Sequence, residues 1–87
     1  MSLRDAIDNF YERLVVDAID ATREESDNAD YLTDVMCVAL NRLPTRYYRH
    51  SIDMMFYLGD DELKAMKQNS LTAVQAAREF VKSHQRD

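Results

Sequence analysis

The chain is poor in the residues that build tight turns, disulfides and membrane spans. Its 87 residues include one glycine, one proline, one cysteine and no tryptophan. One glycine cannot form a glycine-rich phosphate loop, and one cysteine cannot form an internal disulfide. No apolar run approaches the roughly 18 residues of a membrane helix. These absences favour long regular elements within a single domain over residues 1–87.

The chain also lacks an excess of basic residues. Its formal net charge of −5 disfavours broad attraction to DNA or to anionic membranes. The segment 42–50 is an exception, because it holds three arginines and no acid and so carries +3 against −8 on the remainder. A small basic spot on an acidic body fits a small anionic ligand better than a nucleic-acid track. We expect neither direct DNA binding nor membrane insertion.

Residues that carry chemistry are scattered along the chain. Cys37, His50 and His84 occur at no spacing that is typical of metal ligands, such as C-x2-C. Acidic runs are usually solvated faces, and no nucleophile stands in a catalytic pattern. We therefore predict no structural metal, no cofactor and no enzymatic activity. A lone cysteine and a polar N-terminus without a signal-peptide core predict a cytoplasmic protein.

Hydrophobic spacing predicts a mainly α domain of three to four helices. Apolar residues at steps of three and four predict a first helix from Leu3 to about Arg23 and a second over Ala29–Leu43. Pro44 ends the second helix, because proline disfavours the helical conformation in the residue before it. One side of this helix is neither plainly apolar nor plainly polar. Together with the modest core of a small domain, that side predicts a homodimer.

The rest of the chain is less regular. Residues 45–58 are strand-prone in type but alternate poorly, so we predict a short extended or hairpin-like segment. Gly59 and the acids after it predict a turn and a helix cap. A last helix is predicted over 60–83, with a candidate break at Asn69-Ser70 and a frayed tail over 83–87.

Planar cations and aromatic rings gather in the segment from Asn41 to Arg49. Arginine pairs bidentately with phosphate or with the O6/N7 edge of guanine, and tyrosine stacks on bases. One interpretation of this segment is a ligand site at the end of the helix. The other, which these features alone favour, is that the arginines complement the helix dipole and the tyrosines pack on the core.

The run from Asp34 to Tyr47 resembles the late competence development protein ComFB family, whose core reads approximately D-V-x-A-L-A-L-N-x-L-P-P-x-Y. The matching residues are Asp34, Val35, Ala39, Leu40, Asn41, Leu43, Pro44 and Tyr47. Thr45 replaces the second proline. The cysteines that imply zinc in some relatives are replaced by residues 27–30, so zinc is not carried over.

The resemblance implies a small helical homodimer, and some relatives are receptors for cyclic dinucleotides in competence, pilus and motility regulation. We therefore predict a cyclic di-GMP receptor that signals to an unidentified protein partner. Asp34 and Asn41 would orient base or ribose groups, arginines would meet phosphate or guanine, and Tyr47 would stack. The predicted ligand-binding residues are Asp34, Asn41, Arg42, Pro44, Arg46, Tyr47 and Arg49. The alternative is a ligand-free adaptor dimer.

Overall fold

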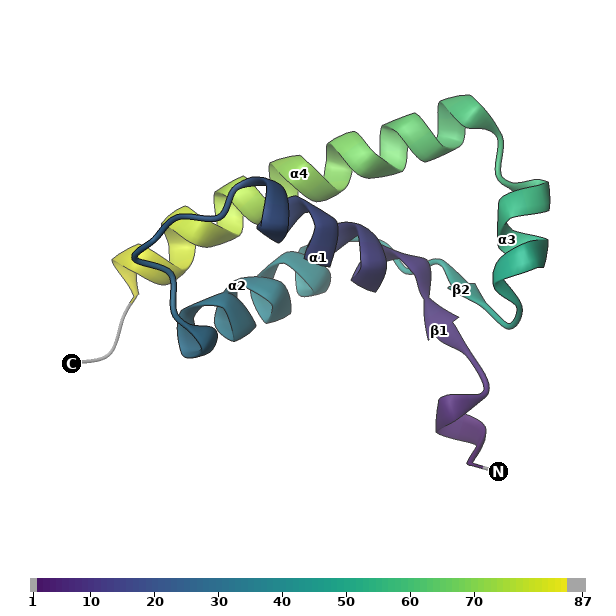
Figure 1. Cartoon of the computed structure of the whole chain (residues 1–87), viewed down its shortest axis with the longest axis horizontal. Coiled ribbons are helices and arrows are strands. Elements are labelled where there is room, and N and C mark those ends of the chain that lie inside the picture. Colours follow the sequence, from purple (N-terminus) through teal and green to yellow (C-terminus); the bar gives the residue numbers. More distant parts are fainter. Residues whose placement is uncertain (1, 85–87) are drawn as a thin grey trace.

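Three helices form the body of the molecule, and a two-stranded sheet and a short helix lie at one end of it (Figure 1). The structure is a computed structural model that describes residues 2–84. Its elements are η1 (Leu3–Asp5), β1 (Asp8–Asn9), α1 (Phe10–Ala21), α2 (Ala29–Arg42), β2 (Tyr47–Tyr48), α3 (Ser51–Tyr57) and α4 (Asp60–Ser83). The prediction of a mainly α fold with a short extended segment after the second helix is confirmed.

The first helix begins later than the apolar spacing predicts. α1 begins at Phe10, and the Asn9 side chain caps it by accepting a hydrogen bond from the Tyr11 N–H at 3.2 Å. Leu3 and Ile7, which continue the helical spacing, are exposed. The predicted start at Leu3 is therefore wrong. The two residues before Phe10 pair as a strand, and a short polar side chain caps the helix there.

The second helix follows its prediction closely. Asn28 caps it, because its Oδ1 accepts a hydrogen bond from the Tyr31 N–H at 2.8 Å. At the other end, Leu43 is extended, with φ −95° and ψ 151°, as expected for the residue before proline. Val35 and Ala39 are fully buried. The apolar stripe of the predicted helix thus faces the core.

The segment after Pro44 is only partly extended. β2 pairs antiparallel with β1, so its partner is the distant N-terminal segment and not a local hairpin strand. The extended prediction is wrong over Ser51–Tyr57, which form α3. Their strand-prone side chains obscured a helical spacing, in which Met54 and Leu58 are buried four residues apart.

The last helix, α4, is continuous over 24 residues. The candidate break at Asn69-Ser70 does not occur, because Ser70 satisfies its buried hydroxyl within the helix by donating to the Met66 carbonyl at 2.8 Å. Ser83 is still helical, and residues 85–87 of the predicted frayed tail lie outside the described residues. Within residues 2–84, no helix combines the length and the apolar character needed to cross a membrane.

The core consists of two clusters. The larger one joins α1, α2 and α4 around Val15, Val35 and Val74, which are all fully buried. The smaller one joins the start of α1 to α3 and to the first half of α4; its buried residues are Phe10, Tyr11, Leu14, Met54, Leu58 and Met66. Leu40 and Leu43 of the α2 end contact both clusters. The segment that carries the family-like motif therefore joins the two halves of the core.

Candidate functional site

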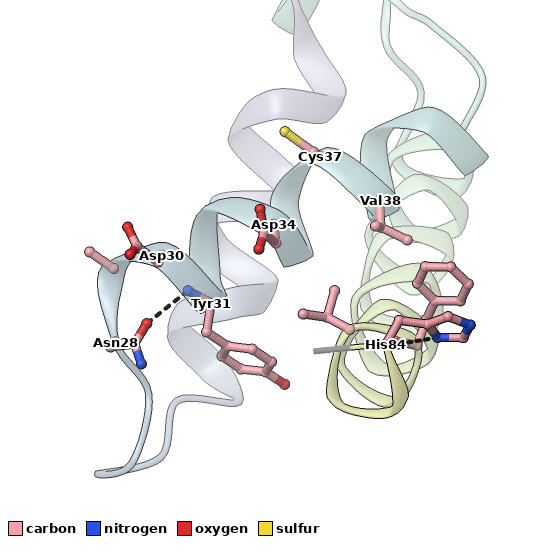
Figure 2. Close-up of a pocket in the computed structure, with 10 residues that line it drawn as sticks. Asn28, Asp30, Tyr31, Asp34, Cys37, Val38 and His84 are labelled. Atoms are coloured by element: carbon pink, nitrogen blue, oxygen red, sulfur yellow. Dashed lines mark hydrogen bonds between the residues drawn. The ribbon is translucent and has the colours of Figure 1, made fainter. Parts of the chain in front are cut away.

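A groove with a volume of about 800 Å³ lies between α2 and the C-terminal end of α4 (Figure 2). Asp34, Cys37 and Val38 line it from α2, and Phe80 and His84 line it from α4. Asp34 is exposed, and one turn of helix separates it from Cys37 and Val38. The groove therefore combines the carboxylates of Asp30 and Asp34 on the α2 wall with the rings of Phe80 and His84 on the α4 wall.

Three planar groups stack beside this groove. The rings of Phe80 and His84 lie 4.1 Å apart between centroids, at an interplanar angle of 18°. The guanidinium carbon of Arg42 lies 4.8 Å from the centroid of the Phe80 ring on the neighbouring helix. His84 Nδ1 lies 2.8 Å from the Phe80 carbonyl oxygen, which fixes the orientation of the imidazole. Flat groups held in this way resemble the surfaces on which nucleic-acid bases stack.

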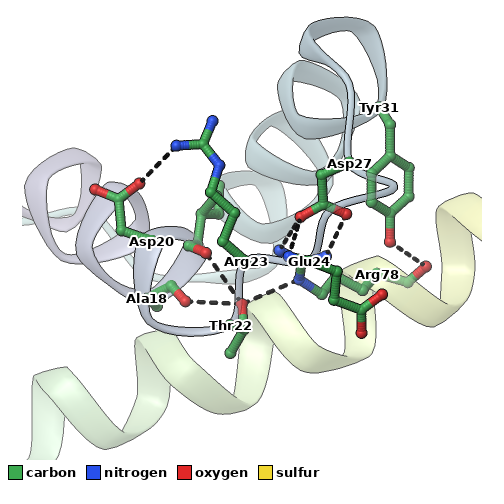
Figure 3. Close-up of polar contacts among 9 residues, drawn as sticks. Ala18, Asp20, Thr22, Arg23, Glu24, Asp27, Tyr31 and Arg78 are labelled. Atoms are coloured by element: carbon green, nitrogen blue, oxygen red, sulfur yellow. Dashed lines mark hydrogen bonds and ion pairs between the residues drawn. The ribbon is translucent and has the colours of Figure 1, made fainter.

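A clamp of polar side chains holds the segment between α1 and α2 against α4 (Figure 3). The Arg78 guanidinium donates to both Asp27 carboxylate oxygens, at 3.1 and 3.0 Å, and to Thr22 Oγ1 at 3.0 Å. The Tyr31 hydroxyl donates to the Arg78 carbonyl at 3.2 Å. Hydrogen bonds from Arg78 and from the Glu24 backbone hold the pKa of Asp27 below its ordinary value. The clamp joins the α1–α2 connection to α4.

A second group of predicted residues lies around β2. The Arg46 backbone N–H donates to Asn9 Oδ1 at 2.9 Å, and its carbonyl accepts from the Phe10 N–H at 2.8 Å. Its side chain is half exposed and pairs with Glu62 at 3.1 Å. Asn9 therefore caps α1 and also fixes the segment that follows Pro44.

The seven predicted ligand residues do not converge on one pocket of a single chain. Only Asp34 lines the groove. Asn41 lies seven residues further along α2, which places it on the same side of the helix, and Arg42 contacts the wall residue Phe80. The others follow the end of α2: Pro44, Arg46, Tyr47 and Arg49. Tyr47 is exposed on its strand.

The aromatic wall of the groove was not anticipated from the sequence. Phe80 and His84 are four residues apart near the end of a predicted helix, which places them on one face. That spacing was the only available signal, since their partner Arg42 is distant in sequence. Among residues 2–84, no group of three or more histidine, cysteine or acidic side chains is placed to hold a metal ion. The absence of a structural metal stays a prediction.

The structure defines a small, mainly helical domain, with its family-like motif at the end of α2. Residues 8–85 match the family described as late competence development protein ComFB. The chain belongs to this family, and the predicted resemblance is confirmed. Its family links it to a role in competence. No curated protein and no solved structure matches the chain.

Proposed function

We propose that the protein is a non-enzymatic cytoplasmic receptor for cyclic di-GMP, which acts as a homodimer and signals to a protein partner in competence, pilus or motility regulation. The observation that supports this most directly is the stack of Arg42, Phe80 and His84 beside the exposed carboxylate of Asp34. A planar platform next to a carboxylate suits a base that presents hydrogen-bond donors along one edge.

Guanine matches this arrangement better than adenine. The guanine N1–H and N2–H2 groups lie side by side and can donate together to one carboxylate, as from Asp34. Adenine presents no such pair of donors. Asn41, on the same side of α2, has both a donor and an acceptor for the ribose or for the base. The expected order of affinity is therefore cyclic di-GMP above cyclic di-AMP.

The two phosphates of the ligand require positively charged partners. The arginines that follow the end of α2, Arg46 and Arg49, supply them. Arg46 is held by Glu62, but both side chains are about 40% exposed, at 42% and 43%, and such pairs contribute little. The weak pair leaves the Arg46 guanidinium accessible to a phosphate, which arginine can bind with two parallel hydrogen bonds. In a homodimer, a two-fold ligand meets each residue twice. Two chains can then complete a site that one chain holds in two parts.

Titration calorimetry with cyclic di-GMP and cyclic di-AMP tests the proposal. The wild-type protein should bind cyclic di-GMP more tightly. Asp34→Asn should weaken cyclic di-GMP binding about tenfold or more, because a charge-assisted bond contributes roughly 1.5–3 kcal/mol. Asp17→Asn is the matched control, since Asp17 is exposed on α1 outside the groove. A protein that binds neither cyclic di-GMP nor cyclic di-AMP would exclude the receptor function.

A ligand-free adaptor dimer is the second candidate function, and the exposed apolar side chains of α3 favour it. The two candidates differ in their response to nucleotides. A receptor at ligand concentrations of about 100 times Kd gains roughly 2.7 kcal/mol of stability, whereas an adaptor gains none. A thermal shift with a panel of nucleotides therefore separates them.

A further inference from the structure

Helix α3 exposes most of its apolar side chains to solvent, although surface helices usually turn their polar side outward. Figure 1 shows α3 at one end of the molecule, where Met54 and Leu58 anchor it in the smaller core cluster. The four exposed apolar side chains, which together form the α3 surface, are Ile52 at 80%, Met55 at 62%, Phe56 at 81% and Tyr57 at 76%.

Three carboxylates lie beside the α3 surface. Asp53 precedes Phe56 by three residues and Tyr57 by four, which places it next to both rings on one face of the helix. Asp60 and Asp61 begin α4 directly after α3. All three acids occupy the first turn of a helix, where carboxylates are favourable. All three are exposed and, among residues 2–84, none belongs to an ion pair, so their charges face the solvent.

This combination of groups restricts what can cover the α3 surface. Residues 49–63 hold four acids and one arginine, which gives this segment a formal charge of −3. The phosphates of nucleic acids and of anionic lipids would therefore be repelled. A second copy packed about the middle of the same helix would set Asp53 against its own counterpart. An apolar segment that carries basic residues meets both the rings and the carboxylates with complementary groups.

The extent of the α3 surface fits a single helix of a partner. Phenylalanine and tyrosine side chains bury about 150–250 Å² each, so four large side chains at these exposures present on the order of 500 Å². Transient signalling encounters bury less than about 1,200 Å² in total, or about 600 Å² on each side. An amphipathic helix that docks through anchors three and four residues apart covers an area of this size.

We propose that the α3 surface binds a cationic amphipathic helix of a protein partner. The apolar stripe of that helix covers Ile52 and Phe56, and its lysine or arginine side chains pair with Asp53, Asp60 and Asp61. This contact rests on the proposed function, because it gives the chemistry of the protein partner to which the receptor signals. The groove between α2 and α4 lies outside the contact.

Fluorescence anisotropy of the full chain with a labelled leucine–lysine peptide, patterned as an amphipathic helix, tests the α3 surface without nucleotide. The wild-type protein should bind the peptide, and Phe56→Ser should weaken binding about tenfold or more, because a covered ring is lost. Phe56 is 81% exposed, so circular dichroism should show an unchanged helix content. Val16→Ser is the matched control, because Val16 is an exposed apolar residue of α1, and its variant should bind as wild type does.

A second pair of variants separates specific pairing from general attraction. A protein with a net charge of −5 attracts any cationic peptide to some extent. Asp53→Asn and Asp17→Asn each remove one exposed negative charge, but only Asp53→Asn should weaken binding, by about two- to fivefold. A leucine–glutamate peptide of the same pattern should bind about tenfold or more weakly than the leucine–lysine peptide, because like charges would face each other.

Four results would overturn the assignment of the α3 surface: no binding of the leucine–lysine peptide, equal binding by Phe56→Ser and wild type, an equal loss in Asp53→Asn and Asp17→Asn, or equal binding of the two peptides. Each would leave the receptor function standing, because nucleotide calorimetry measures that function separately. A protein that binds the peptide as expected but neither cyclic dinucleotide would lose the receptor function and keep the docking surface.

Discussion

Replacement of Arg78 by methionine should destabilise the domain far more than the same change at any exposed arginine. Arg78 is 7% exposed and joins α4 to the α1–α2 connection. Methionine preserves much of the apolar stem of the side chain but removes the guanidinium. The substitution therefore eliminates the hydrogen bonds to Asp27 and Thr22 and leaves the packing of the stem largely unchanged.

The expected loss follows from the geometry. Removal of one partner from a buried ion pair costs about 3–5 kcal/mol. The lower end applies to Arg78→Met, because residues 24–26 beside Asp27 are exposed and the released carboxylate can turn toward water. A loss of about 3 kcal/mol lowers the melting temperature of a domain this size by more than about 10 °C. Arg23→Met is the matched control, since Arg23 pairs with Asp20 at 3.7 Å with both side chains 61% exposed, and it should cost within about 0.5 kcal/mol.

Urea denaturation at one fixed protein concentration measures the difference, and its pH dependence identifies the cause. The bond to Arg78 lowers the pKa of Asp27 from its ordinary value of 3.8. The ion pair therefore stabilises the folded state fully at pH values above 3.8. It is lost as the pH falls through the lower pKa of the folded state. The gap between wild type and Arg78→Met should therefore be full at pH 7 and shrink below pH 3.8. Equal stability of the two proteins at pH 7 would refute the clamp.

Two further predictions concern the segment after Pro44. Arg46→Ala should weaken cyclic di-GMP binding by about a hundredfold, measured by calorimetry, because in a dimer it removes a phosphate contact from both chains. Loss of the half-exposed pair with Glu62 should cost at most about 1 kcal/mol of stability, measured by thermal melts. Asn9→Ala should lower the free energy of unfolding, measured by urea denaturation, by about 1–2 kcal/mol, because Asn9 Oδ1 accepts hydrogen bonds from both the Tyr11 and the Arg46 N–H groups. The control Asn69→Ala, on the exposed side of α4, should leave the free energy of unfolding unchanged.

The fold was predictable where the sequence pattern is set by a buried face. α2 and α4 follow their apolar spacing, and Pro44 marks the end of α2 as proline sterics require. The prediction failed where apolar residues are exposed. Ile7 extends the helical spacing of α1 although it lies outside the helix, and the exposed Ile52 and Phe56 gave α3 the composition of a strand. Hydrophobic spacing predicts helices only where the apolar residues are buried, so it fails for exposed apolar residues such as these.

The candidate site was predictable only along α2. Asp34 and Arg42 lie beside the groove because both are on the one helix whose motif was identified. The opposite wall, with Phe80 and His84, depends on the packing of α4 against α2, which no local spacing reveals. The Arg78 clamp joins residues that are 51 positions apart, and no local spacing predicts that pairing.

The two leucines that connect the core clusters have a thermodynamic consequence. Leu40 and Leu43 flank Asn41 and Arg42, and they contact the cluster into which α3 inserts Met54. These leucines link the end of α2, where Asn41 and Arg42 lie, to the packing beneath α3. If nucleotide binding tightens the dimer by some factor, dimerisation must tighten nucleotide binding by the same factor, because the free energies close a cycle. Cellular protein concentration would then set nucleotide sensitivity, and the receptor would respond to its own abundance.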